Sequence, residues 1–286
     1  MSEPPDIFAG QPASAELLAE LYDLEHDEIV EDLVFYRELA GRTRGAILDL
    51  GCGSGRLFSS LLAGGARHVV GLDGSAALLE RARRRVAGDP ALAAAAAARR
   101  LELVHGDVRA VAVGRRFSLI VAVGVLPHLG TPDAVLAMLW SARRRLTPPG
   151  RLVLDDLGPG AMPHRDLPLS VDWTRRLGER TLRRSSRLLR SEEAGGLRVD
   201  YSTLTESIGA DGTIAPLSAE YRLWYPSPDT LSRLAREAGL AVELSFGSHD
   251  LDELGPESER RIFILRRTRR TTAAGDTGGG GHRHER

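Results

Sequence analysis

The sequence predicts an α/β fold in which helices cover both faces of a mostly parallel, doubly wound sheet. The first observation is that short apolar segments alternate with segments whose apolar residues recur at helical spacing. Such alternation is typical of parallel sheets that are buried on both faces. The second is that serine or threonine caps precede several of the helical segments. The third is that 286 residues, 42% of them hydrophobic, can bury a substantial core.

The expected elements follow one another in the order that such a fold requires. Helical spacing of apolar residues between Ala13 and Ala40 predicts two short helices before the sheet. The seven candidate strands are Gly45–Leu50, His68–Leu72, Leu101–Val104, Phe117–Val123, Arg151–Asp155, Val242–Phe246 and Arg261–Leu265. The candidate helices are one that begins near Arg56, Ser75–Val86, Pro132–Leu146 and one that runs from the Ser227 cap to Ala238. The alanine-rich run from Ala91 to Ala98 is expected to be a helical extension or a solvated linker.

The rhythm changes after residue 158, where glycine and proline mark a loop. Alternating segments follow near Thr181–Arg190, Leu197–Ile208 and Thr213–Trp224, with a hairpin turn before the last of them. We expect an antiparallel insertion here, which covers the substrate or forms a dimer surface. The expected divisions are a flexible arm (1–12), an N-terminal helical lid (13–44), the core (45–162), the insertion (163–225), the end of the core (226–266) and a disordered tail (267–286).

Composition excludes several classes of function. The formal net charge of -1 predicts no general attraction to nucleic acid or to an anionic membrane. The absence of lysine excludes a Schiff base and a phosphate-loop lysine, and the single cysteine, Cys52, excludes an intrachain disulfide and a thiolate zinc cluster. His282 and His284 are expected to be solvated, so no metal is predicted. The first residues do not resemble a signal peptide and no apolar run approaches about 18 residues, so a cytoplasmic protein is expected.

A glycine-rich turn follows the first candidate strand. The run Asp49-Leu-Gly51-Cys-Gly53-Ser-Gly55 enters a helix, and its glycines let the backbone turn sharply and approach a ligand without an intervening Cβ. Asp73 ends the second strand and follows Gly51 by 22 positions, which suits a carboxylate that accepts both hydroxyls of a ribose. The residues themselves predict a nucleotide-binding site and leave NAD open as the ligand.

The stretch Ile47–Arg56 resembles the first motif of the class I S-adenosylmethionine-dependent methyltransferases, which has an acid two residues before a GxGxG core. Three later segments resemble further motifs of this family in the same order. They are the ribose motif Val70–Asp73, the third motif Val104–Asp107, whose acid contacts the adenine amine, and the turn into the fifth strand, Leu146–Val153. The resemblance spans residues 45–156 and extends to about 266. It implies a Rossmann-like sheet and methyl transfer from S-adenosylmethionine.

The resemblance also implies a role for each motif residue. Asp49 and the glycines would hold the methionine end of the cofactor, and Asp73 and Asp107 would hold the nucleoside end. Arg56 would clamp the cofactor carboxylate, with a solvated arginine at a helix start as the alternative. Cys52 is expected to be a small loop residue and not a nucleophile. The cofactor-binding residues implied are Tyr36, Asp49, Gly51, Cys52, Gly53, Gly55, Arg56, Asp73, Gly74, Asp107, Val108 and Val123.

The fourth motif bears on the acceptor. Val123-Gly-Val-Leu-Pro-His128 stands where enzymes that methylate nucleic-acid bases or protein glutamine carry Asp/Asn-Pro-Pro-aromatic, and it resembles the small-molecule branch of the family. The expected catalytic residues are His128, as a base with an ordinary pKa of about 6.5, and Tyr22, from the N-terminal lid. The alternatives are a histidine that caps the loop and a tyrosine that packs in the core. His26, one turn beyond Tyr22, is a weaker candidate for the same site.

The expected function is methylation of a small-molecule acceptor, at nitrogen in preference to oxygen or carbon. The expected partner is that acceptor, with no nucleic acid and no membrane, and a homodimer is left open. The insertion carries aromatic residues for acceptor contacts, namely Trp173, Tyr201, Tyr221, Trp224 and Tyr225. Two alternatives remain. One is a protein that binds S-adenosylmethionine without methyl transfer, such as a cyclase or a non-catalytic subunit, and the other is an NAD-dependent oxidoreductase.

Overall fold

The computed structural model describes residues 4–11, 14–43 and 45–268 of the chain. The predicted tail therefore lies almost wholly outside the described residues, together with His282 and His284. Among the helices of the described part, none combines the length and the apolar character that a bilayer crossing needs.

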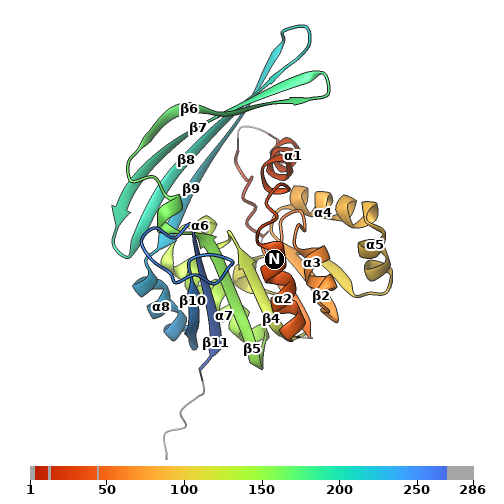
Figure 1. Ribbon diagram of the computed structural model, residues 1–286, viewed down its shortest axis with the longest axis vertical. Helices are drawn as coiled ribbons and strands as arrows, with labels where there is room; N and C mark the ends of the chain where they lie inside the picture. The colour runs from red at the N-terminus through yellow and green to blue at the C-terminus, as the bar shows by residue number, and fades with distance from the viewer. Residues whose placement is uncertain (1–3, 12–13, 44, 269–286) are drawn as a thin grey trace, which may run out of the picture.

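A seven-stranded sheet forms the centre of the molecule, as predicted (Figure 1). Its strands are β1 (Ala46–Leu50), β2 (His68–Asp73), β3 (Leu101–His105), β4 (Phe117–Val123), β5 (Leu146–Leu157), β10 (Leu240–Phe246) and β11 (Arg260–Arg267). They lie in the order β10-β11-β5-β4-β1-β2-β3. The pairs from β5 to β3 are parallel, whereas β11 is antiparallel to both β5 and β10. The order of the parallel strands along the chain reverses between β4 and β1. The carboxyl ends of these two strands therefore lie at the switch point, where open α/β sheets bind ligands.

Helices cover both faces of this sheet. They are α1 (Ala15–His26), α2 (Leu33–Thr43), α3 (Phe58–Ala63), α4 (Ala76–Gly88), α5 (Pro90–Ala97), α6 (Leu126–Leu129), α7 (Pro132–Arg145) and α8 (Pro228–Glu237). Short 3-10 turns lie at Val108–Ala110 and Pro159–Ala161. Side chains of α7 and α8 share one apolar cluster with the sheet, and side chains of α2, α3, α4 and α5 share the other. The predicted caps are present, since the hydroxyls of Ser75, Thr131 and Ser227 each accept a backbone N–H of the following helix.

The insertion is a four-stranded antiparallel sheet that projects from the core (Figure 1). Its strands are β6 (Leu167–Leu177), β7 (Arg180–Glu193), β8 (Gly196–Ile208) and β9 (Ile214–Pro226). The prediction missed β6, which lies at the edge of the sheet and is exposed along most of its length. Its apolar residues Leu167, Leu169, Val171 and Trp173 recur at every second position, which is a strand signal that the prediction overlooked.

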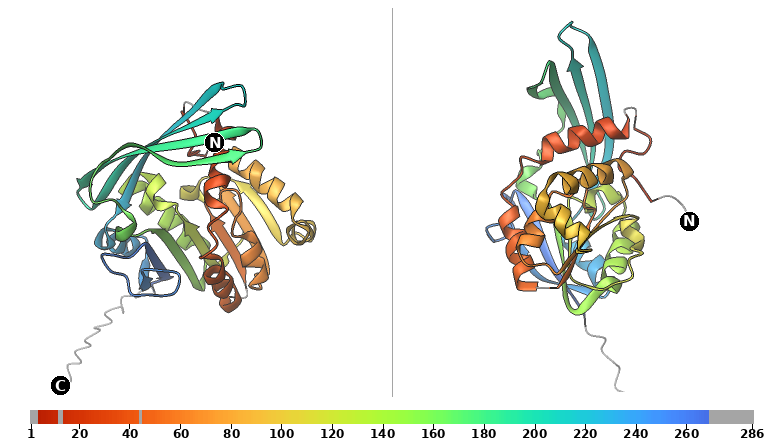
Figure 2. Two further views of the ribbon diagram at one scale, coloured as in Figure 1. Left: turned by 45° about the horizontal axis from the view of Figure 1, so that its top comes forward. Right: turned by 90° about the vertical axis from the view of Figure 1, so that its right-hand side faces the viewer.

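The N-terminal segment joins the two sheets. In the right-hand view of Figure 2, α1 lies across the core beneath the four-stranded sheet. Leu18 of α1 packs in one cluster with Leu78 of α4 and Ala219 of β9. Phe8, only 5% exposed, belongs to the same cluster, and the Gln11 amide exchanges two hydrogen bonds with the Glu220 backbone. Residues 4–11, expected as a flexible arm, thus rest on the core, because Phe8 supplies an apolar anchor.

Candidate active site

The loop after β1 is the centre of the candidate site. Gly51 and Gly53 both have a left-handed backbone, with φ of 76° and 55°, which residues with a Cβ rarely adopt. The amides of Gly51 and Cys52 donate to the Leu72 carbonyl at 2.7 and 3.1 Å, and these bonds tie the loop to the end of β2. A Cβ on Gly53 would lie 3.0 Å from the Tyr22 hydroxyl of α1. The loop and α1 therefore face each other closely across Gly53.

Asp73 lies at the end of β2 and supports this loop. Its carboxylate accepts the backbone N–H groups of Gly53 and Ser75, both at 2.8 Å. Burial raises the pKa of Asp73, while these two backbone hydrogen bonds oppose the rise. Asp73 is thus held in a fixed orientation beside the loop. A carboxylate that binds a ribose needs to be held in this way.

Asp49 has an unsatisfied oxygen in the middle of the site. The side chain is 2% exposed, and its Oδ2 atom has no hydrogen-bond partner among the described residues. Burial raises the pKa of Asp49 to about 7; Arg56 lowers it and Asp73 raises it further. Because an unpaired buried acceptor costs about 1–3 kcal/mol, this oxygen is a position that a donor group of a ligand would satisfy.

We expect Asp49→Asn to stabilise the ligand-free protein at high pH. With a folded-state pKa of about 7 against an ordinary value of about 3.9, the stability falls as the pH rises from about 4 to 7. The substitution removes this ionisation and should raise the free energy of unfolding by about 2–4 kcal/mol at pH 8, and by little at pH 4. Urea denaturation at both pH values measures the effect, with Asp133→Asn, exposed on α7, as control. An equal change at the two pH values would contradict it.

The other nucleoside-end residues lie beyond β2 and β3. Asp107 caps the 3-10 turn that begins with Val108, and it pairs with Arg109 at 2.9 Å. The Pro5 carbonyl lies close over Gly74, where a Cβ would come within 2.0 Å of it. The N-terminal segment therefore passes over the end of the candidate ribose site.

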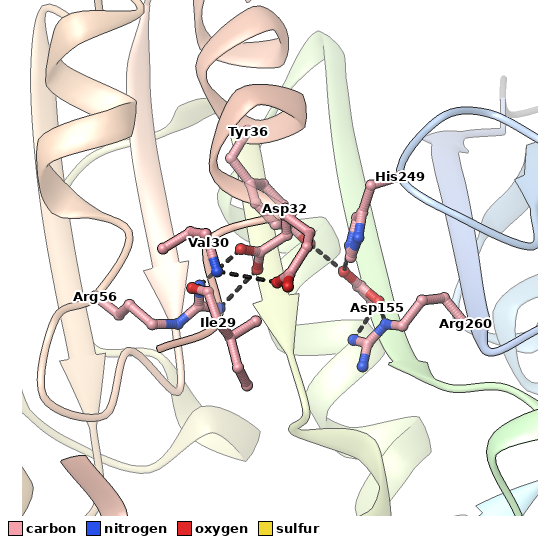
Figure 3. A network of polar contacts seen from close by, with 9 residues as sticks. Ile29, Val30, Asp32, Tyr36, Arg56, Asp155, His249 and Arg260 are labelled. Carbon is pink, nitrogen blue, oxygen red and sulfur yellow. Dashed lines mark hydrogen bonds and ion pairs between the residues drawn. The ribbon is translucent and has the colours of Figure 1, made fainter. Parts of the chain in front are cut away.

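Arg56 has a partner that the sequence did not indicate. Its two terminal nitrogens donate to both carboxylate oxygens of Asp32, at 2.7 and 2.6 Å, and one also donates to the Ile29 carbonyl (Figure 3). The expected clamp of Arg56 on a cofactor carboxylate stays a prediction, while this bidentate pair ties the loop to the segment between α1 and α2. The physical reason is that Asp32 is buried and needs a counter-charge.

Tyr36 and Val123 both lie beside a second buried carboxylate, Asp155 of β5 (Figure 3). Val123 ends β4 opposite Asp155 in the sheet, and the Tyr36 hydroxyl donates to the Asp155 carboxylate at 2.6 Å. His249 and Arg260 also donate to this carboxylate, at 2.7 Å and at 2.9 and 2.5 Å. Tyr36, expected to face the cofactor, therefore directs its hydroxyl to Asp155. No motif pointed to this cluster, because its members come from four distant segments.

Cys52 is buried beside Gly71, and its thiol donates weakly to the Gly53 carbonyl at 3.7 Å. Burial raises the pKa of the Cys52 thiol, with the charge of Asp73 adding to the effect. A neutral, buried thiol is a poor nucleophile, which agrees with the expectation that Cys52 only fills the loop.

Four ring side chains gather above the loop, and we name Tyr22, His26, His128 and Tyr221 the aromatic cluster. Tyr22 and His26 stack with ring centroids 3.9 Å apart, and His128 meets the edge of Tyr221 at 6.1 Å. Tyr22 and Tyr221 pack against the same apolar cluster between α1, α4 and β9. The N-terminal lid, the fourth motif and the insertion thus each contribute rings to this cluster, and its Tyr22 hydroxyl lies over Gly53.

The electrostatics of the aromatic cluster favour uncharged rings. Burial raises the pKa of the Tyr22 hydroxyl, and the charge of Asp73 adds to the rise. His128 is exposed to solvent, yet the surrounding protein atoms and the neighbouring His26 lower its pKa. At neutral pH both histidines are therefore neutral and able to accept a proton.

Arg184 connects the insertion to the lid. It forms ion pairs with Glu25 of α1 and with Asp172 of β6, and it donates to the Tyr201 hydroxyl at 3.0 Å. Of the other insertion aromatics, Trp224 is buried in the core. The neighbouring Arg183 of β7 pairs with Glu206, so both arginines are paired within the protein.

The comparisons with known proteins agree with this architecture. Residues 47–150 match the family described as a methyltransferase domain. A tRNA U34 carboxymethyltransferase of Cronobacter sakazakii is 30% identical over 138 residues, which are 47% of this chain and 37% of that protein. The chain thus matches well under half of that relative's length.

Two solved structures share the fold over nearly the whole chain. The sugar N-methyltransferase KedS8 from Streptoalloteichus has a TM-score of 0.69 at 18% identity and covers 93% of this chain and 98% of its own. S-adenosylmethionine-bound CalS10, an amino pentose methyltransferase from Micromonospora echinaspora, has a TM-score of 0.62 at 24% identity and covers 87% and 97%. At these identities the likeness concerns the fold.

Proposed function

We propose that this protein methylates an amine of a small molecule with S-adenosylmethionine. The match of residues 47–150 to a methyltransferase domain and the fold shared with an S-adenosylmethionine-bound methyltransferase support this proposal. The observation that carries the proposal is the aromatic cluster over Gly53. The cluster contains two neutral histidines and two tyrosines, and the Tyr22 hydroxyl reaches the loop of the methyltransferase domain. An amine acceptor needs a proton acceptor at this place, and a hydrogen-bonding surface that orients it.

The residues around the loop fit S-adenosylmethionine. The unpaired Oδ2 of Asp49 offers an acceptor for the ammonium group of the methionine end. Asp73, fixed by two backbone amides, offers a carboxylate for the ribose hydroxyls. The left-handed Gly53 leaves the backbone open on the side of Tyr22, where a Cβ would narrow the space.

The chemistry is an in-line displacement. When bound, S-adenosylmethionine supplies an activated methyl group, whose carbon–sulfur bond breaks as the acceptor nitrogen bonds to carbon, with the electron pair kept by sulfur. This chain must therefore orient the acceptor nitrogen and remove one proton from it. Tyr22 and Tyr221 would orient the acceptor, and one histidine of the aromatic cluster would take the proton.

Several observations support the preference for a small molecule. The fold shared with a sugar N-methyltransferase and an amino pentose methyltransferase extends over the four-stranded insertion. The tRNA-modifying relative matches less than half of the chain, and the basic residues Arg183 and Arg184 pair with acids inside the protein. The net charge of -1 gives no electrostatic attraction to a polyanion.

The test is a screen of purified protein with radiolabelled S-adenosylmethionine. The acceptors are amino-sugar nucleotides, glycopeptide amines, the corresponding hydroxyl compounds and bulk tRNA. We expect label in an amine product and release of S-adenosylhomocysteine. Transfer only to hydroxyl, carbon or tRNA would contradict the proposed acceptor. Cofactor binding without transfer would favour a non-catalytic role, and preferential binding of NAD in calorimetry would favour an oxidoreductase.

A further inference from the structure

The two histidines of the aromatic cluster differ in how they are held. His26 lies in the last turn of α1, and its ring stacks on Tyr22 at 3.9 Å with 13° between the planes. Its Nδ1 atom lies 2.8 Å from the Tyr22 carbonyl oxygen. A carbonyl oxygen can only accept, so Nδ1 carries the hydrogen. In the neutral ring Nε2 is then the nitrogen with the free lone pair.

His128 is not oriented in this way. Its ring contacts the edge of Tyr221, and no hydrogen bond to either ring nitrogen occurs within the described part of the chain. Neither tautomer of His128 is selected by the protein. Efficient bases are commonly oriented by a hydrogen bond at the other ring nitrogen, and only His26 meets that condition here.

The charged groups that act on His26 come from α1, from the glycine loop and from β7. Burial lowers its pKa, the Tyr22 carbonyl opposes this, Arg56 of the glycine loop and Arg184 of β7 lower it further, and Asp23 raises it. Desolvation by the surrounding protein atoms, and to a smaller extent the neighbouring His26, lowers the pKa of His128. Burial, with a smaller contribution from the two arginines, lowers the pKa of His26 and favours its neutral ring at pH 7.

We propose that Nε2 of His26 takes the proton from the acceptor nitrogen, with its tautomer fixed by the Tyr22 carbonyl and its ring held by the stack on Tyr22. This inference rests on the proposed function. Tyr22 then has two roles, since its hydroxyl lies over Gly53 and its backbone orients the base. His128 lines the acceptor surface against Tyr221. A purely structural His26 would serve only as a helix-terminal side chain that bonds the last turn of α1.

The test uses sinefungin, in which an amine replaces the methyl-bearing sulfonium, and compares it with S-adenosylhomocysteine, which lacks this amine. Calorimetry of wild type, His26→Phe, His26→Gln and His128→Ala at pH 7.5 gives both affinities. Phenylalanine preserves the stack on Tyr22 and removes both nitrogens. We expect His26→Phe to reduce the preference for sinefungin by about tenfold or more, with the affinity for S-adenosylhomocysteine nearly unchanged. Glutamine should restore part of the preference, and His128→Ala should keep it.

Each of the other possible results would overturn either the assignment of the base or the proposed function. A preference that survives in His26→Phe, or that is lost in His128→Ala, overturns the assignment of the base while the methyltransferase function stands. Wild-type protein that binds neither compound overturns the proposed function and this inference with it. Imidazole ¹⁵N spectra give a second readout, since Nε2 of His26 must be the unprotonated nitrogen at pH 7.5. A ring protonated at Nε2 instead would overturn the proposal.

Discussion

Asp73→Ala should weaken the binding of S-adenosylmethionine by at least about 100-fold. Two ribose hydroxyls that donate to one carboxylate contribute about 1.5–3 kcal/mol each, because hydrogen bonds to a charged group are the stronger ones. The same carboxylate holds the amide of Gly53, so its loss also releases the glycine loop. Titration calorimetry with wild type and variant measures the ratio of dissociation constants.

Two further variants separate direct from indirect effects. Asp73→Asn keeps the shape and one acceptor oxygen, so we expect it to bind more tightly than Asp73→Ala and less tightly than wild type. Asp133→Ala, exposed on α7, should leave binding unchanged. Unchanged affinity in Asp73→Ala would remove Asp73 from the cofactor site.

Asp155→Ala should cause the largest loss of stability, about 3–5 kcal/mol in the free energy of unfolding. The substitution removes the common acceptor of Tyr36, His249 and Arg260 and leaves their donors buried or half-buried without it (Figure 3). Urea denaturation at pH 7 measures the loss. The control is Glu243→Ala, which breaks a partly exposed ion pair with Arg151 and should cost at most about 1 kcal/mol.

The contribution of Asp155 should depend on pH in a defined direction. Burial raises its pKa, but the hydrogen bonds from His249 and Tyr36 and the charge of Arg260 outweigh this and hold the pKa below the ordinary value. The stabilisation is therefore complete above about pH 4 and disappears as the pH falls toward the folded-state pKa. A difference between wild type and variant that grows below pH 4 would contradict the assigned direction.

The same buried carboxylates mark the limit of what the sequence could predict. Asp49 and Asp73 stand in motifs at the ends of consecutive strands, so their position in the fold followed from local pattern alone. Asp32 and Asp155 stand in no motif. Their partners Arg56, Tyr36 and Arg260 lie 24, 119 and 105 positions away, and only the packed structure brings them together.

The sequence by itself predicted the seven-stranded architecture, and its motifs indicated a methyltransferase domain. Apolar periodicity, helix caps and a glycine loop are local features. They can be recognised in the sequence because the backbone geometry of helices, strands and turns requires particular residues at particular spacings. The tertiary structure alone decided that Arg56 pairs with Asp32. It also stacked His26 on Tyr22 over Gly53 and brought His128 against Tyr221. These arrangements depend on burial and on contacts between distant segments, and neither has a periodic signature in the chain.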